Sequence, residues 1–213
     1  MRLLTIFFWL GVVVAPAAST ASSPSQLCDT AALKASEITG VPVHTLMTLA
    51  RVETGRDNAP WPWTMNISGK GYWLESRPQA RTLALRTMKS GNRSFDVGCF
   101  QINYRWHGQN FSSLAEMFEP DANALYAARF LNALHDELGS WPRAIAAFHS
   151  RTPELGRRYL RRFNQISASL KQHEAYAMQP YPVVSNQDNK GASLQLLADV
   201  PTRAHLNSLW KSQ

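Results

Sequence analysis

The sequence lacks the residue patterns that mark several large enzyme classes. Its six histidines and two cysteines show no His-x-x-x-His or mixed Cys/His spacing of the kind that binds a metal ion. It also has no glycine-rich phosphate-binding loop and no Gly-x-Ser-x-Gly nucleophile elbow. We therefore expect a protein that uses no metal, no nucleotide and no other cofactor.

Long apolar runs are scarce as well, and the one that stands out lies at the N-terminus. Arg2 precedes an apolar run over 3–14, and the small residues of 15–21 follow it. This order is typical of a secretory signal peptide, which we expect over 1–21. The run is shorter than the roughly 20 residues of a membrane-spanning helix, so a membrane anchor is the less favoured alternative. We therefore expect export to the periplasm.

Cysteine is rare, and the two examples are Cys28 and Cys99. An exported protein folds in an oxidising compartment, so we expect these two residues to form a disulfide, with two free buried thiols as the alternative. After removal of the signal peptide about 190 residues remain, which is enough for one well-filled core.

Acidic residues are few relative to basic ones. The sequence has 22 Lys and Arg residues against 15 Asp and Glu residues, which gives a net charge of +7. In an exported protein this excess favours an anionic partner, such as cell-wall polymer or a lipid surface. The expected export argues against nucleic acid as a partner, because nucleic acid stays in the cytoplasm.

The apolar pattern predicts a mainly α fold with a small β-hairpin insertion. Prolines, an internal Gly-Lys-Gly turn and alternating residues predict the hairpin within 56–75, and the segment SFDVG at 94–98 is expected to be a loop. Helical spacing and capping residues predict helices over 29–40, 42–55, 76–88, 122–138 and 141–148, and from 153 onward.

The composition changes near residue 172. Residues 22–172 carry punctuated helices without an internal repeat, which predicts a single domain. Residues 173–213 are rich in Pro, Asn, Gln and Ser and show no sustained period, so we expect a tail that is mostly disordered.

One carboxylate, Glu53, lies where helical geometry places apolar residues. It continues the stripe of Leu46, Leu49 and Ala50 on one face of the expected helix. Burial and a position in the last helical turn both raise the pKa of a carboxyl group. A carboxylic acid that stays protonated near neutral pH can donate a proton to a glycosidic oxygen. The alternative is a structural glutamate that caps a loop.

Three motifs, in order along the chain, resemble those of one enzyme family. The segment LARVETG at 49–55 resembles the end of the catalytic helix in family 1 lytic transglycosylases and goose-type lysozymes. GCFQIN at 98–103 is similar to their Gly-Leu-Met-Gln-Ile-Asn signature. AIAAFHS at 144–150, followed by RRYL at 157–160, resembles their third motif, Ala-Tyr-Asn-Ala-Gly.

The resemblance implies a lysozyme-like helical domain that cleaves peptidoglycan glycan strands between N-acetylmuramic acid and N-acetylglucosamine. Glu53 would act first as an acid and then as a base toward the sugar's own 6-hydroxyl, which gives a 1,6-anhydro product. Because the substrate supplies the nucleophile, a second catalytic carboxylate is not needed. Asp96 is the one nearby candidate, and we interpret it as an Asx-type turn residue.

The second motif implies two residues that contact the glycan. Gln101 matches the glutamine that lines the family's cleft and hydrogen-bonds sugar, with a buried amide satisfied by the backbone as the alternative. Asn103 ends the same motif, and it either contacts the sugar or caps the next turn.

The third motif departs from the family pattern at Phe148, which replaces the usual tyrosine. The missing hydroxyl is then supplied by Tyr159, by Tyr72 or by no residue. His149 either hydrogen-bonds the glycan or is a satisfied structural group. The arginines within 157–162 are interpreted as a solvated helix face opposite Tyr159, with attraction to anionic wall polymer as the alternative.

Two other functions stay open at this stage. A muramidase-type hydrolase would cut the same bond with water, and the product alone separates it from a transglycosylase. An inactive peptidoglycan-binding module would keep the fold, although a buried Glu53 is costly to retain without a use. Either enzyme could serve a cell-envelope assembly machine, with the tail as its docking element.

Overall fold

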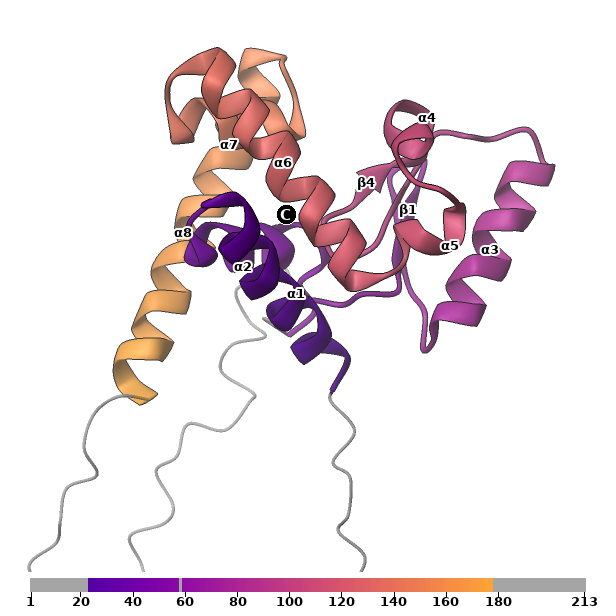
Figure 1. The fold of residues 1–213 in the computed structure, drawn as a ribbon, viewed down its shortest axis with the longest axis horizontal. Coiled ribbons are helices and arrows are strands. Elements are labelled where there is room, and N and C mark those ends of the chain that lie inside the picture. The colour runs from indigo at the N-terminus through magenta and orange to yellow at the C-terminus, as the bar shows by residue number, and fades with distance from the viewer. Residues whose placement is uncertain (1–22, 58, 178–213) are drawn as a thin grey trace, which may run out of the picture. The chain divides into compact units, whose positions relative to one another are not determined.

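The structure is a computed structural model that describes residues 23–57 and 59–177 (Figure 1). The expected signal peptide and the tail from residue 178 onward lie outside these residues. The described part is mainly helical with one small antiparallel sheet, which confirms the expected fold class. No helix within the described residues combines the length and apolar character that crossing a membrane requires.

Five helices form the framework around the site. α1 (Pro24–Thr39) contacts α2 (Val43–Thr54) and α6 (Pro120–Leu138), and α6 contacts α7 (Trp141–His149). The fifth helix, α8 (Pro153–Ala177), follows α7 in the chain. α8 is helical through 173–177, the start of the expected tail. Small side chains let α1 and α6 approach closely. The fully buried alanines of these two helices are Ala31, Ala32, Ala124, Ala127 and Ala128.

The start of α1 differs from the sequence-based expectation of a helix that begins at Asp29. The helix begins at Pro24, because Ser23 and Gln26 form a capping box in which each side chain accepts a hydrogen bond from the other's backbone N–H. Asp29 is therefore inside the helix, where it pairs with Arg51 of α2 at 2.7 Å.

The hairpin expected within 56–75 is confirmed and belongs to a larger sheet. β1 (Thr64–Ile67) pairs with β2 (Lys70–Trp73) and with β3 (Phe95–Val97), and β3 pairs with β4 (Ile102–Asn103). The loop expected over 94–98 is wrong, since its centre is strand β3. Three residues of alternation are too short a pattern to identify a strand in the sequence.

The two faces of this sheet differ in character, because successive strand residues point to opposite sides. One face is apolar and includes Met65, Phe95, Val97 and Ile102, all at most 3% exposed. We call the other the polar sheet face. By register it consists of Thr64, Asn66, Gly71, Trp73, Asp96 and Asn103.

Short elements complete the chain around the sheet. α3 (Arg77–Lys89) follows the hairpin close to the helix expected at 76–88. Between β4 and α6 the structure has three short helices that the sequence pattern did not predict. These are α4 (Tyr104–His107), the 3₁₀ helix η1 (Gly108–Asn110) and α5 (Leu114–Met117).

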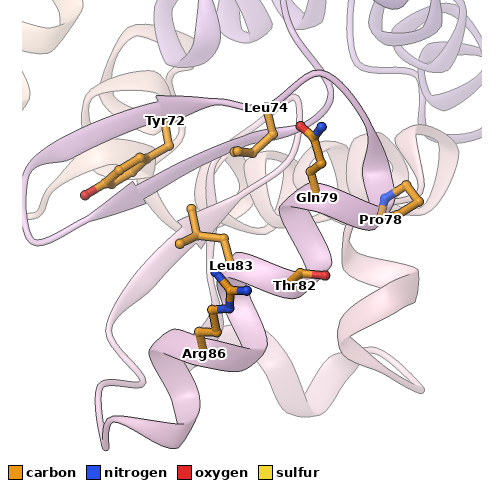
Figure 2. A pocket seen from close by; sticks show the side chains of 7 residues that line it. All are labelled: Tyr72, Leu74, Pro78, Gln79, Thr82, Leu83 and Arg86. Atoms are coloured by element: carbon orange, nitrogen blue, oxygen red, sulfur yellow. The ribbon is translucent and has the colours of Figure 1, made fainter.

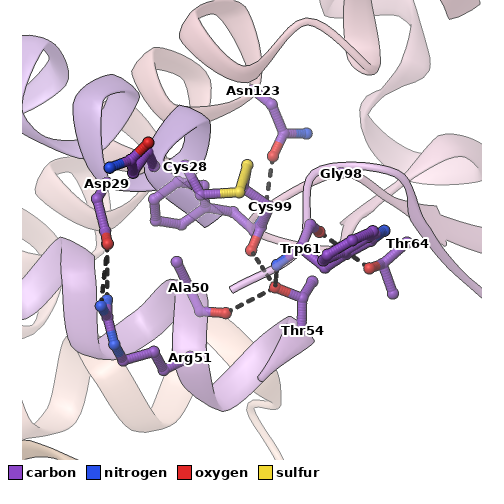
Figure 3. The surroundings of a disulfide bond; sticks show 12 residues. Cys28, Asp29, Ala50, Arg51, Thr54, Trp61, Thr64, Gly98, Cys99 and Asn123 are labelled. Atoms are coloured by element: carbon purple, nitrogen blue, oxygen red, sulfur yellow. Dashed lines mark hydrogen bonds and ion pairs between the residues drawn. A yellow bond between two sulfur atoms is a disulfide. The ribbon is translucent and has the colours of Figure 1, made fainter. Parts of the chain in front are cut away.

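The disulfide expected between Cys28 and Cys99 is present, with the two Cα atoms 5.7 Å apart (Figure 3). Both residues are fully buried. The bond ties α1 to the turn between β3 and β4, which carries the GCFQIN motif. It closes a sequence separation of 71 residues, so it links the beginning of the domain to its sheet.

Candidate functional site

The site is built around Glu53, in the last turn of α2. Leu46, Leu49 and Ala50 are fully buried on the same helix face, which confirms the stripe expected from the sequence. Glu53 is itself partly exposed, as a group that meets a substrate has to be. The surrounding side chains still remove most of the water that would stabilise a carboxylate at this position.

Tyr159 supplies a hydroxyl to this carboxylate from α8. Its phenol donates a hydrogen bond to Oε1 of Glu53 at 2.5 Å, and the tyrosine is 7% exposed. A second contact between the two helices joins His44 of α2 and Ser167 of α8 at 2.8 Å. Of the three possibilities left open by Phe148, the geometry therefore selects Tyr159.

The surroundings of Glu53 raise its pKa to about 7. Burial is the largest cause, the hydrogen bond from Tyr159 opposes it, and the negative charge of Asp96 adds to it. The positive charge of Arg162 lowers the pKa of Glu53. Burial also raises the pKa of Tyr159 well above its ordinary value, so its hydroxyl keeps its proton. Glu53 can therefore exist in both protonation states near neutral pH.

Asp96 lies on the polar sheet face rather than in a turn. It sits in β3 opposite Asn66 and Asn103, so the Asx-turn interpretation is wrong. The amide nitrogen of Asn103 donates to Oδ1 of Asp96 at 2.7 Å. Burial raises the pKa of Asp96, and this hydrogen bond opposes the shift. A second carboxylate thus lies close enough to Glu53 for their charges to interact.

Asn103 also caps the helix that follows it, as the sequence allowed. Its side-chain oxygen accepts a hydrogen bond from the backbone N–H of Arg105, at the start of α4. One side chain therefore fixes both Asp96 and the entry into α4. These contacts are structural, and contact with the sugar stays a prediction for Asn103.

Gln101 braces the same turn through backbone contacts. Its amide nitrogen donates to the carbonyl of Gly98 at 2.9 Å and to the carbonyl of Thr64 at 3.1 Å. Its φ of 46° lies in the left-handed region. The side-chain amide of Gln101 is therefore hydrogen-bonded to the backbone, which is the alternative that the sequence left open. Contact between its carboxamide oxygen and sugar stays a prediction.

Asn123 of α6 holds this turn from the other side. It is fully buried, and its oxygen accepts from the backbone N–H of Phe100 at 2.9 Å (Figure 3). Its nitrogen donates to the carbonyls of Val97 and Met117. A Cβ atom at Gly98 would lie 2.5 Å from the Asn123 amide, and φ at Gly98 is +82°. The glycine of the motif therefore makes room for Asn123.

Thr54 connects the end of α2 to the sheet. Its hydroxyl accepts from the backbone N–H of Trp61 at 3.0 Å, and it lies 3.5 Å from the carbonyl of Cys99 (Figure 3). The indole of Trp73 donates to the carbonyl of Thr54 at 3.0 Å. Because Thr54 follows Glu53 directly, these contacts fix the backbone at the candidate acid.

Phe148 and His149 take different roles at the end of α7. The Phe148 ring packs against Phe130 of α6, with ring centroids 5.5 Å apart. The His149 ring stacks on Tyr159, at 4.6 Å between centroids and 2° between planes. Burial and the positive charge of Arg162 lower the pKa of His149. The histidine therefore packs against Tyr159, the hydrogen-bond partner of Glu53, in surroundings that disfavour its protonated form.

Tyr72 lies on the sheet face opposite Trp73, on the side of the hairpin that faces α3. Figure 2 shows it with Leu74 above α3. Together with α3 they line an open groove of about 540 Å³. The α3 residues of this groove are Pro78, Gln79, Thr82, Leu83 and Arg86.

Two contributors were missed by sequence reasoning. Arg162 lies on an exposed helix face, as the sequence predicted, but its charge also acts on Glu53, Tyr159 and His149, which the sequence did not predict. Its spacing of three residues from Tyr159 on one helix was the available signal. The anchor from Trp73 to Thr54 had no sequence signal, since it joins a strand to a helix end.

Within the described residues, no group of three or more His, Cys, Asp and Glu side chains is arranged to hold a metal ion. Comparisons with protein-family models, with curated proteins and with solved structures found no significant match.

Proposed function

We propose that the protein is a peptidoglycan lytic transglycosylase with Glu53 as its catalytic acid and base. The observation that carries the proposal is Glu53, a partly exposed residue whose carboxyl group has a pKa of about 7 and accepts a 2.5 Å hydrogen bond from Tyr159. Such a group can give up a proton and take one back near neutral pH. The order of the three sequence motifs supports peptidoglycan as its substrate.

In the first step, protonated Glu53 donates its proton to the glycosidic oxygen between N-acetylmuramic acid and N-acetylglucosamine. The bond from that oxygen to C1 of the muramic acid breaks, and N-acetylglucosamine leaves with a hydroxyl group. Glu53 is then a carboxylate. The Tyr159 hydroxyl and the charge of Arg162 both favour this ionised form.

In the second step, the 6-hydroxyl oxygen of the muramic acid forms a bond to C1, and Glu53 takes the hydroxyl proton. The product is a 1,6-anhydro ring, and the protonated acid is restored without consumption of water. Tyr159 binds Oε1 of Glu53 throughout, which leaves Oε2 to exchange the proton with the sugar. The pKa near 7 suits a group that must act in both directions.

A hydrolase is the second candidate, and Asp96 is the observation that favours it. Its negative charge raises the pKa of Glu53, so the two carboxyl groups lie near one another. Two carboxyl groups flanking the bond are what most glycosidases use. Burial raises the pKa of Asp96 and the hydrogen bond from Asn103 lowers it. Asp96 is thus partly buried and held by a hydrogen bond, unlike a carboxylate in a solvated loop.

The setting of the enzyme follows from the N-terminal sequence. The basic, apolar and small-residue order over 1–21 supports export to the periplasm, where peptidoglycan is accessible. The segment that follows α8 is the element that would dock to a cell-envelope assembly machine. An inactive binding module is disfavoured, because a desolvated carboxylate is costly to keep without a use.

The test is mass spectrometry of the muropeptides released from purified sacculi. Wild-type protein should release products lighter by one water than those of a muramidase, and Glu53→Gln protein should release none. The amide keeps the size of the side chain but cannot donate the proton. Products without the anhydro ring would establish the hydrolase, and release by Glu53→Gln at the wild-type rate would refute both enzymes.

A further inference from the structure

The polar sheet face carries a single aromatic residue, Trp73, whose side chain is both exposed and fixed. Trp73 is 41% exposed, although burial of an indole is one of the larger sources of stability in a fold. Its Nε1 donates to the carbonyl of Thr54 at 3.0 Å. The indole is therefore held at one edge while a large part of it stays in contact with solvent.

Gly71 provides the second constraint on the indole. A Cβ atom at Gly71 would lie 2.9 Å from two carbons of the six-membered ring of Trp73, which shows that the ring lies over Gly71. Gly71 and Trp73 are two residues apart in β2 and so share one sheet face. A side chain at Gly71 would lift the indole off the strand.

The neighbours of this indole belong to the candidate site. Thr54, its hydrogen-bond acceptor, follows Glu53 in the chain. Asn66 pairs with Gly71 on one side and with Asp96 on the other, so the three strands present them in one row. Asn66 uses its oxygen to accept from Gly69 N–H at 2.9 Å, and its amide nitrogen is the group it can offer to a ligand.

The geometry points to Trp73 as the platform of a sugar-binding subsite beside Glu53. A pyranose ring has an apolar face of C–H groups, which packs on the electron-rich face of an indole, and polar edges that seek hydrogen bonds. The exposed indole supplies the first surface, and Asn66 supplies a donor at its edge. The inference rests on the proposed function, since the ring belongs to the glycan strand that Glu53 cleaves.

Binding of the oligosaccharide chitotetraose, measured by calorimetry in a Glu53→Gln background, tests the subsite without cleavage. Trp73→Ala should weaken binding by about tenfold or more, as removal of a central aromatic contact does. Trp73→Phe should stay within about threefold of the parent, because it keeps a flat ring and loses only the Nε1 donor. Tyr72→Leu, one residue away but on the opposite sheet face, is the matched control and should bind like the parent.

Each outcome decides the proposal. Unchanged binding in Trp73→Ala, or no binding in the parent, would overturn the subsite. Equal losses in Trp73→Ala and Trp73→Phe would also overturn it, because the anchor to Thr54 and not the ring would then be responsible. Should Trp73→Ala fail to fold, fluorine NMR of fluorotryptophan-labelled protein replaces it. The resonance of Trp73 is identified as the one that is absent from the spectrum of Trp73→Phe protein. It must shift saturably with chitotetraose, and a resonance that does not shift would overturn the subsite.

The proposed function and the subsite can be refuted separately. If sacculi yield no cleavage products while chitotetraose binding depends on Trp73, the enzyme proposal is wrong and the subsite stands as that of a binding module. If cleavage occurs and binding ignores Trp73, the subsite is wrong and the enzyme stands.

Discussion

The hydroxyl of Tyr159 donates a 2.5 Å hydrogen bond to Oε1 of Glu53, although the two residues lie 106 positions apart. Leu46, Leu49 and Ala50 are fully buried on that face of α2, so the carboxyl group meets its partner where the apolar stripe ends. α8 must pack against α2 for the pair to form. The environment of Glu53 therefore depends on α8, the helix that follows the one containing Phe148.

Tyr159→Phe removes this donor and keeps the ring. The hydrogen bond lowers the pKa of Glu53, so its loss should raise that pKa further above its present value of about 7. The rate falls as Glu53 loses its proton, so this decline should move to higher pH in the variant. A pH profile of kcat/KM between about pH 5 and pH 9 measures the shift. A decline at the wild-type pH would contradict a role for Tyr159 in setting the acid.

Glu53→Gln should change stability in a pH-dependent way. The pKa of Glu53 is about 7 in the folded protein against an ordinary value of 4.5, so folding is favoured by the protonated form. This contribution is fully present below pH 4.5 and is lost as pH rises toward 7. At about pH 8 the Gln variant should be more stable than wild type by up to about 3 kcal/mol, with little difference at about pH 4. Urea unfolding at the two pH values tests this, and equal differences at both would refute a raised pKa.

Asp96→Asn separates the two enzyme mechanisms. In a transglycosylase the sugar's 6-hydroxyl closes the ring, so loss of this charge should change the rate only modestly. The pKa of Glu53 should fall slightly, because the negative charge of Asp96 raises it. The rate of muropeptide release and the mass of the products are the measurements. Collapse of activity in a folded variant, with products that lack the anhydro ring, would favour the hydrolase.

His149→Ala should lower activity through Tyr159. The two rings stack at 4.6 Å, and removal of one leaves the tyrosine less constrained. A loss of several-fold in kcat with little change in KM is expected, and His149→Phe should restore most of it. Direct binding of the glycan by the imidazole predicts a different result, in which KM rises and Phe restores nothing.

Removal of the disulfide should cost substantial stability. A closed loop of 71 residues constrains the unfolded chain by about 4 kcal/mol in the chain-entropy description. The variant with Cys28→Ala and Cys99→Ala should therefore unfold at a lower urea concentration than the oxidised wild type. Reduced wild-type protein is the matched control and should behave like the double variant. Equal midpoints for oxidised and reduced protein would contradict the expected stabilisation.

Much of the helical framework could be predicted because its signals are local. The stripe from Leu46 to Glu53 and the glycines after α1 and α6 give the type and ends of these helices. The early start of α1 was also local, in the capping pair of Ser23 and Gln26, but it lies close to the expected signal peptide. Asp29 is also a good N-cap residue, so the sequence offers two possible starts for this helix.

The parts of the site that could not be predicted depend on contacts between distant segments. β3 is too short to show a period, and Asp96 acquires its place only when β1 pairs beside it. The choice between Tyr159 and Tyr72 depends on where α8 and β2 lie relative to Glu53. Helical and strand periodicity in the sequence carries no information on these positions. The placement of Arg162 on an exposed helix face is confirmed, but its electrostatic effect on Glu53 could not be predicted, because the position of the neighbouring helix is not contained in the periodicity of α8.

Gly98 and Asn123 have a consequence for how this chain can vary. The amide of Asn123 occupies the space that a Cβ at position 98 would need, and it bonds both the end of β3 at Val97 and the turn at Phe100. The two positions are therefore energetically coupled. Alanine at 98 would displace the amide, and a smaller residue at 123 would remove hydrogen bonds to three backbone groups. If the GCFQIN motif at 98–103 were grafted onto another protein, the turn would keep its conformation only if an asparagine equivalent to Asn123 were grafted with it.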